Sequence, residues 1–223
     1  VEIDRRRVEV LERFRPEPGG LAMIDPLDHV EPIAEIYDRY RRGRVGEVSR
    51  TARWIEMRLK EEPGRRRGAL HRDGYAIWTI TPDWNEFDVQ HELRLDDLVA
   101  CTPEARLALW NLVLSHDLVG PIRTWHSVTL DDPLPALLTN PRAVRTTAVN
   151  DFLWLCPRRV GELLAARRYR VVDALVVDVD GERWRIDGGP DGAAASSTDA
   201  EPDLTMTRAA MGALILGGVT ATE

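Results

Sequence analysis

The stretch from Asp73 to Leu118 places the strongest constraint on what this chain can fold into. It opens with Asp73-Gly74, a pair typical of the type I′ turn between antiparallel strands because both residues tolerate a positive φ. Residues 75–80 are rich in aromatic and β-branched side chains, and apolar and polar side chains then alternate over 89–96. The pattern predicts two antiparallel strands, the second with one wet face.

A capped, amphipathic helix is predicted directly after these strands. Thr102-Pro103-Glu104 supplies an N-cap hydroxyl, a proline at the first helical position and an acid at the positive end of the helix dipole. Apolar residues recur with helical spacing at Leu107, Trp110 and Leu114, with Leu118 one turn later. A sheet half covered by a helix is an α+β core, and we expect that sheet to be mixed or antiparallel.

The composition argues against several classes of partner. The 223 residues carry a net charge of −7, which disfavours a general affinity for nucleic acid or anionic membranes. Two cysteines do not make a disulfide framework, and no stretch resembles a signal peptide or an apolar span of about 20 residues. The histidines lack the spacing of metal ligands. We therefore expect a cytoplasmic protein without a metal site.

The chain reads as two domains and as a piece of a longer protein. It begins at Val1 rather than at a methionine, and it ends shortly after a helix-like run. Proline and polar residues around Asn140-Pro141-Arg142 mark a junction. The predicted divisions are a leading strand and linker at 1–20, a first domain at 21–145 and a smaller α+β domain at 146–223.

Within the second domain, three local patterns stand out. An apolar run at 152–156 predicts a strand, and Asp180-Gly181 predicts a second hairpin turn. Glycines, prolines and small polar residues between 188 and 203 predict a loop that is partly mobile.

Several segments, taken in order, resemble a known family. They include Asp73-Gly74-Tyr75-Ala76 and the segments 36–40, 103–105, 116–119 and 137–142. Together they resemble the central part of the enhanced intracellular survival (Eis) acetyltransferases. The segments 203–206 and 212–218 look like the sterol-carrier-type (SCP2-like) domain that ends those proteins.

The resemblance implies a division of labour within a longer enzyme. Such proteins join a catalytic GNAT acetyltransferase domain, a degenerate second copy of it and a sterol-carrier-like domain, and this chain resembles the last two. In the family, acetyl-CoA, the general-acid tyrosine and the terminal carboxylate that acts as base all lie outside the part matched here. The resemblance therefore implies that this chain contains no catalytic or cofactor-binding residue. It also implies a homo-oligomer, which in the family is a hexamer.

The residues themselves agree that no cofactor site is present. GNAT enzymes hold the pyrophosphate of the cofactor with the pattern Arg/Gln-x-x-Gly-x-Gly/Ala, whose glycines let backbone N–H groups converge on one anion. Arg65-Arg66-Arg67-Gly68-Ala69-Leu70 ends in leucine where a small residue is needed, and Arg158-Arg159-Val160-Gly161-Glu162-Leu163 fails in the same way.

The candidate substrate residues are aromatic side chains beside charged ones. Trp54 lies on an otherwise polar helix, and Trp84 lies in a turn with Asp83 and Glu86. An aromatic ring near carboxylates suits a polycationic amine. The alternative for both residues is a structural role, in which the tryptophan packs against its own segment and stabilises it. The other tryptophans are expected in the core. Ser115-His116-Asp117 is not a catalytic triad, because adjacent helical residues point in different directions.

These observations favour one function and leave a second open. The first is acetyl transfer from acetyl-CoA to amines of a multi-amine substrate, aminoglycoside-like or lysine, with this portion forming a substrate-cavity wall and an oligomer interface. By itself the chain is then expected to be inactive. The alternative is a non-catalytic module whose sterol-carrier-like half binds a lipid or another apolar ligand, which a continuous apolar tunnel would support and a packed core would oppose.

Overall fold

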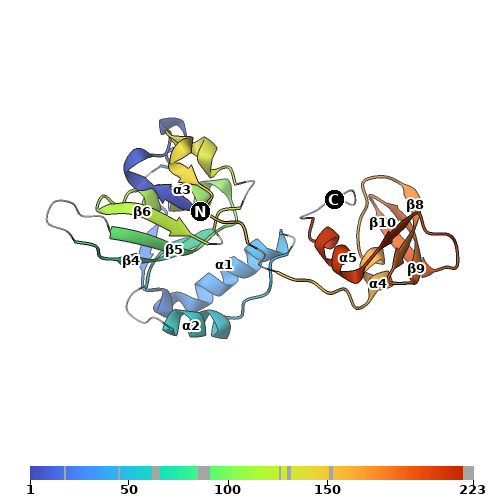
Figure 1. Ribbon diagram of the computed structural model, residues 1–223. Coiled ribbons are helices and arrows are strands. Elements are labelled where there is room, and N and C mark those ends of the chain that lie inside the picture. Colours follow the sequence, from blue (N-terminus) through green and yellow to red (C-terminus); the bar gives the residue numbers. More distant parts are fainter. Residues whose placement is uncertain are drawn as a thin grey trace. The chain divides into compact units, whose positions relative to one another are not determined.

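The computed structural model divides the chain into two compact units, Val1–Val149 and Asn150–Glu223 (Figure 1). It describes residues 1–17, 19–44, 46–61, 66–84, 91–125, 127–129, 132–150 and 153–217. The predicted α+β class is confirmed, because each unit combines one sheet with helices. The division falls after Val149, a few residues beyond the predicted boundary at 145.

The first unit is built on a seven-stranded sheet with the order β2-β3-β4-β5-β6-β1-β7. All neighbours are antiparallel except β5 and β6, which run parallel because α3 crosses between them. The strands are β1 (Glu2–Asp4), β2 (Ala22–Ile24), β3 (Arg66–His71), β4 (Gly74–Thr81), β5 (His91–Ala100), β6 (Val119–Thr124) and β7 (Val144–Arg145).

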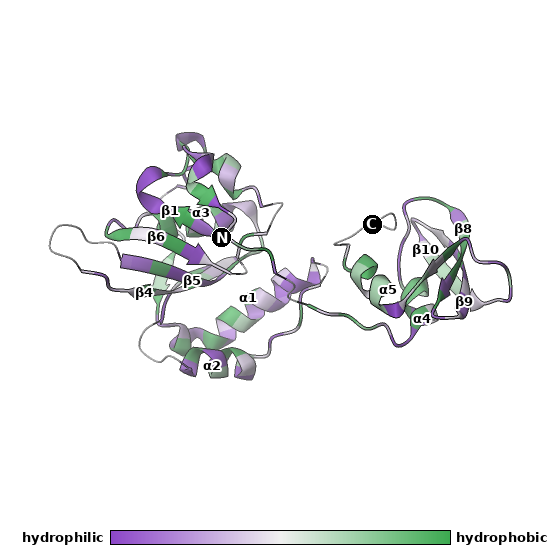
Figure 2. Ribbon diagram, in the orientation of Figure 1, coloured by the Kyte–Doolittle hydropathy of each residue, from purple (hydrophilic) through white to green (hydrophobic). Residues whose placement is uncertain are grey.

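Helices cover both faces of this sheet. On one face α1 (Val30–Arg42) and α2 (Ala52–Lys60) bury Ile33, Ile55 and Leu59 against Tyr75 and Ile77 of β4. On the other face α3 (Pro103–Leu114) belongs to a second core with strands β3 to β6. Figure 2 shows green and purple residues side by side along α1, as expected for a helix with one buried face. Short 3₁₀ helices occupy Arg5–Arg7, Glu12–Phe14, Pro26–His29, Leu134–Leu137 and Pro141–Ala143.

A β-bulge in β5 sets the orientation of two neighbouring carboxylates. Ile77 pairs with Asp97 whereas Trp78 pairs with Leu95, so Asp96 is the extra residue. Asp96 accepts a hydrogen bond from Thr79 Oγ1 at 3.2 Å, and Asp97 accepts one from the Tyr75 hydroxyl at 2.8 Å. The bulge therefore turns both side chains toward the face that α1 and α2 cover, and it shifts the apolar alternation of the strand by one residue.

The β3–β4 turn corrects the prediction of a type I′ turn at Asp73-Gly74. His71 pairs with Gly74, so the two loop residues are Arg72 and Asp73, and neither these nor Gly74 has a positive φ. Glycine is required at 74 for a different reason. A Cβ there would lie 2.7 Å from the carbonyl oxygen of Val99 in β5 and 3.0 Å from the side chain of Leu109 in α3, so there is no room for one.

The second unit has a four-stranded sheet with the order β10-β9-β8-β11. The Asp180-Gly181 turn has the two positive φ values, 51° and 86°, that a type I′ turn needs. Buried Val177, Val179 and Met211 form its core. The elements are α4 (Val160–Ala165), β8 (Asp173–Val179), β9 (Glu182–Gly189), β10 (Gly192–Ser197), β11 (Leu204–Met206) and α5 (Arg208–Ile215).

Several local predictions were wrong. Residues 153–156 form no strand, while residue 152 lies outside the described part of the chain. The segment predicted as a loop at 188–203 contains β10, which pairs with β9 over its full length. Trp125 and Trp154 are 77% and 84% exposed rather than buried, and Leu118, predicted on the apolar face of α3, is 51% exposed.

Candidate functional site

The junction between β5 and α3 is one place where an anion could bind, because the first N–H groups of a helix have no partner within the helix. Here the chain occupies or removes two of them. Thr102 Oγ1 accepts the Ala105 N–H at 3.2 Å, and Pro103, the first residue of α3, has no N–H. Glu104 adds a negative charge beside the same end. This helix start is therefore unsuited to a pyrophosphate.

The two motif-like segments do not provide an anion cradle either. Gly68 lies inside β3, and Arg65 lies outside the described residues. Gly161 lies within α4, where a Cβ would meet the Trp184 ring at 2.2 Å, so the indole fills the space that the glycine leaves. Among the described residues, neither the start of α3 nor these two segments offers a cradle for the phosphates of acetyl-CoA, the cofactor that the resemblance implies.

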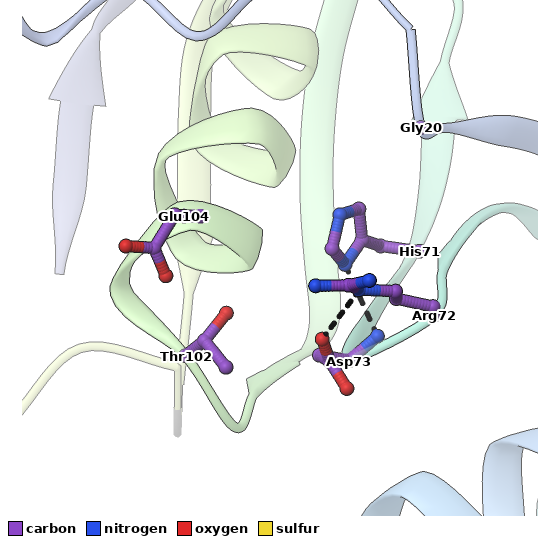
Figure 3. Close-up of a pocket in the computed structure, with 6 residues that line it drawn as sticks. All are labelled: Gly20, His71, Arg72, Asp73, Thr102 and Glu104. Carbon is purple, nitrogen blue, oxygen red and sulfur yellow. Dashed lines mark hydrogen bonds and ion pairs between the residues drawn. The ribbon is translucent and has the colours of Figure 1, made fainter.

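A cavity of about 380 Å³ opens beside the start of α3 (Figure 3). Thr102 and Glu104 line it from the helix, and three residues line it from the β3–β4 turn. The main chain joins the two sides, because the Cys101 N–H donates to the Asp73 carbonyl at 2.8 Å. The complete lining is Gly20, His71, Arg72, Asp73, Thr102 and Glu104.

Asp73 is the most strongly engaged group of this cavity. Its carboxylate accepts Arg39 Nη1 at 2.8 Å and Arg72 Nε at 3.0 Å, and its own N–H donates to His71 Nδ1 at 3.1 Å. The hydrogen bond from Arg39, helped by Arg72, lowers the pKa of Asp73 below its usual value. Asp73 is therefore ionised and tied to the hairpin, so it is a poor candidate for a general base.

A second polar cluster lies under α1 and the start of α2. Arg50 Nη1 donates to Asp97 Oδ2 at 2.7 Å, and the Arg50 guanidinium lies 4.1 Å from the Tyr37 ring centroid. The Tyr75 hydroxyl donates to the same Asp97 oxygen. Burial raises the pKa of Asp97 and also that of Tyr75. Shifted pKa values are common at catalytic sites, but here each ionisable end has a partner, so the cluster is suited to bracing the fold.

The predicted substrate residues separate into two places. Trp84 packs edge-on against His91 with 4.8 Å between ring centroids, and the Asp83 N–H donates to His91 Nδ1 at 3.1 Å. Trp54 instead faces Arg50 and Arg58, whose guanidinium carbons lie 5.5 and 5.9 Å from its ring centroid. Glu86 lies outside the described residues. Within the described part, no contact joins Trp54 to Trp84, and their role in substrate binding stays a prediction.

The remaining reactive residues have structural partners. Ser115 Oγ donates to the Leu112 carbonyl at 2.7 Å, and His116 Nδ1 lies 3.2 and 3.1 Å from the carbonyl oxygens of Leu112 and Val113. Serine and histidine therefore bond to the end of α3 and not to each other. Across the described residues, no group of three or more His, Cys, Asp or Glu side chains is arranged to hold a metal ion. None of the described helices has both the length and the hydrophobicity needed to cross a membrane.

Sequence reasoning missed the cavity residues. His71 and Glu104 are 33 positions apart, and no spacing rule joins them. The register of β4 against β5, which pairs Gly74 with Ala100, brings the hairpin turn to the start of α3. One signal in the sequence could have indicated the site. A hairpin turn, two antiparallel strands and a capped helix follow one another directly, and this order places the turn and the helix N-terminus at the same end of the sheet.

Comparison with known proteins shows which family this chain resembles. The Acetyltransferase (GNAT) domain family matches residues 46–166. The chain is 33% identical over 232 residues to N-acetyltransferase Eis of Mycobacterium bovis, covering 96% of this chain and 55% of that protein. It is 32% identical to an uncharacterized N-acetyltransferase of Streptomyces avermitilis, covering 92% of this chain and 54% of that protein. The chain thus spans about half the length of these relatives.

Solved structures agree with the sequence comparison. The crystal structure of Eis1 from Mycobacterium abscessus superposes with a TM-score of 0.83 at 31% identity, covering 98% of this chain and 57% of that one. A GCN5-related N-acetyltransferase from Anabaena variabilis, at 17% identity, has the same fold with a TM-score of 0.74, covering 98% and 57%. The chain therefore belongs to the GNAT acetyltransferase family and is similar to its Eis members.

Proposed function

We propose that this chain is the non-catalytic portion of an acetyl-CoA-dependent N-acetyltransferase. The observation that carries the proposal is the start of α3. Pro103 removes one N–H, Thr102 caps another, and Glu104 supplies a negative charge where a cofactor phosphate needs donors. In this proposal the cofactor and the proton-transfer groups belong to a further domain, and the present chain shapes and supports the active site.

The proposed substrate carries several primary amines, as an aminoglycoside does, or is a lysine side chain. Net charge supports this choice, since −7 attracts a cation more readily than an anion. The 69% exposed Trp84 also supports it, because its ring has free surface for a cation next to Asp83. Trp54 is the weaker candidate, since Arg50 and Arg58 already lie near its ring.

Assembly into a homo-oligomer, a hexamer by analogy with the family, is part of the same proposal. Trp125 and Trp154, at 77% and 84%, are the most exposed tryptophans of the described residues. Aromatic side chains are enriched at protein–protein interfaces, which supports a role for these residues in subunit contacts. We likewise propose that the protein acts in the cytoplasm.

The test is acetyl transfer to a primary polyamine, followed as release of free coenzyme A thiol. We expect none from this chain alone, and activity from the longer protein in which its natural neighbouring domain is restored. Turnover by the isolated chain would contradict the proposal. So would an inactive longer protein that nevertheless binds acetyl-CoA and the amine.

The second candidate function is binding of an apolar ligand by the sterol-carrier-like unit. Leu175 favours it, because this residue shares its sheet face with the buried Val177 but is 40% exposed. The core opposes it, since Trp184 packs on Gly161 and buried Met211 fills the space under α5. A saturable fluorescence increase of a bound fatty-acid probe, lost in Leu175→Asp, would favour this candidate.

A further inference from the structure

The cavity beside α3 contains polar groups whose bonding capacity the fold does not use. We propose that it binds a small dipolar ligand, one that carries a primary ammonium group and a carboxylate on the same molecule, as a free amino acid does. This inference does not depend on acetyl transfer. It rests on Glu104 and Thr102 on one side of the cavity and on His71 and Arg72 on the other (Figure 3).

Glu104 is the proposed ammonium partner. It lines the cavity from the first turn of α3, and within the described residues no hydrogen bond or ion pair engages its carboxylate. Asp73, the other carboxylate that lines the cavity, has cationic partners in Arg39 and Arg72. A carboxylate that faces a cavity without a partner offers a charge-assisted hydrogen bond to an ammonium group.

Arg72 and His71 are the proposed carboxylate partners. Arg72 uses its Nε for Asp73, which leaves the two terminal nitrogens without a partner among the described residues. His71 Nδ1 accepts the Asp73 N–H, so a neutral ring carries its proton on Nε2. The Nε2 atom lies beside Gly20, which has a φ of +77° and no side chain to cover it. Two donors therefore face the space on the hairpin side.

Thr102 can donate a further hydrogen bond to the ligand. Its oxygen accepts the Ala105 N–H as the cap of α3, but its hydroxyl proton is not needed for that bond. It lies on the helix side of the cavity together with Glu104 (Figure 3). A ligand carboxylate or hydroxyl oxygen can accept a hydrogen bond from the Thr102 hydroxyl.

The charges around the cavity favour a dipolar ligand over a simple ion. Arg39 and Arg72 contribute two positive charges, and Asp73 and Glu104 contribute two negative ones. The site is therefore neutral overall, with poles on opposite sides. An anion alone would meet Glu104 and the missing N–H of Pro103, and a polycation would meet both arginines. The volume of about 380 Å³ lies near the lower end of the range for small-molecule sites.

The test is titration of the ¹⁵N-labelled chain with β-alanine, 4-aminobutyrate and glycylglycine, followed by amide chemical shifts. These probes place the two charged groups at different separations. We expect at least one to give saturable shifts at Gly20, Arg72 and Glu104, with Kd on the order of millimolar, as suits a few charged contacts. Ethylamine and acetate, which have one pole each, should bind at least about tenfold more weakly.

Variants assign the two poles. Glu104→Gln and Arg72→Gln should each weaken binding of the best probe about tenfold, whereas Glu12→Gln, the same charge change at an exposed site, should leave it unchanged. The proposal would be overturned if none of the three probes gave saturable shifts at concentrations up to about 50 mM, which is about fifty times a millimolar Kd. Equal binding of acetate or ethylamine, or an unaffected Glu104→Gln variant, would overturn it as well. No acetyl-CoA is present, so these outcomes are independent of the proposed function.

Discussion

Arg50 Nη1 lies 2.7 Å from Asp97 Oδ2, and this contact joins the residue just before the α2 cap to strand β5. Both side chains are about one-fifth exposed or less, at 17% and 20%. Arg50→Met should lower the free energy of unfolding by about 2–4 kcal/mol, because it leaves a largely buried carboxylate without its cation. Urea unfolding followed by circular dichroism measures the change.

The matched control is Arg15, whose ion pair with Glu9 has the same 2.7 Å distance but is more than half exposed. Arg15→Met should change stability by less than about 1 kcal/mol. In the double variant Arg50→Met/Asp97→Asn, part of the loss should be recovered, since no unpaired charge remains. Equal effects of the two arginine replacements would refute the bracing role of Arg50.

Asp73 predicts an acid-dependent contribution to stability. The hydrogen bond from Arg39 lowers the pKa of this carboxyl in the folded state. Its stabilising contribution is therefore complete above the ordinary pKa of about 4 and disappears as the pH falls through the lower folded value. Asp73→Asn keeps a residue suited to turns, so its deficit in urea midpoint should be largest near neutrality and vanish in acid. A deficit that grows on acidification would contradict this assignment.

Gly161 predicts a steric test of the second unit. A Cβ at this position would lie 2.2 Å from the Trp184 ring. Gly161→Ala should cost about 1–3 kcal/mol by overpacking, despite a gain of up to about 1 kcal/mol in helix propensity. Calorimetry should show a lower melting temperature for this unit only.

Gly43→Ala is the control for Gly161, because the nearest atom to its Cβ would be the Tyr40 carbonyl oxygen at 3.8 Å. It should leave the transition of its own unit nearly unchanged. Adding Trp184→Leu to Gly161→Ala should restore part of the loss. An unchanged transition in Gly161→Ala would show that α4 does not pack on the indole.

Trp84 and Asp83 test the amine-binding role of the first unit. Trp84→Ala and Asp83→Asn should each weaken binding of spermine to the chain by about two- to fivefold, the size expected for one exposed cation–π or ionic contact. Isothermal calorimetry in low salt provides the measurement. Trp154→Ala, which removes an even more exposed indole from the other unit, should have no effect. The role of Trp84 fails if its replacement and the control behave alike.

The sequence predicted those elements whose local chemistry and tertiary role coincide. Thr102 caps α3 as expected, and Asp180-Gly181 forms the turn that its residue types favour. In each case a short segment carries both the conformational preference and the partner, so no distant information was needed.

Features set by distant pairing were not predictable. The bulge at Asp96 depends on the register of β4 against β5, and β10 forms only because β9 offers an edge to a run of alanine and serine. The sequence predicts Gly74 as a turn residue because Asp-Gly is a strong local signal, but the close approach of the Val99 carbonyl oxygen is what requires glycine there. The cavity residues were not predictable for the same reason, because the pairing of β4 with β5 brings them close together. Local patterns do not encode such contacts.

We propose that, within the described residues, the start of α3 offers no cofactor cradle, because Thr102 caps one N–H, Pro103 lacks one and Glu104 adds a negative charge there. Isothermal titration of the chain with acetyl-CoA tests it most directly, with an active GNAT acetyltransferase as the positive control. We predict no saturable heat at concentrations up to about a millimolar, which corresponds to a binding free energy weaker than about −4 kcal/mol. Stoichiometric binding with a micromolar Kd would contradict the account.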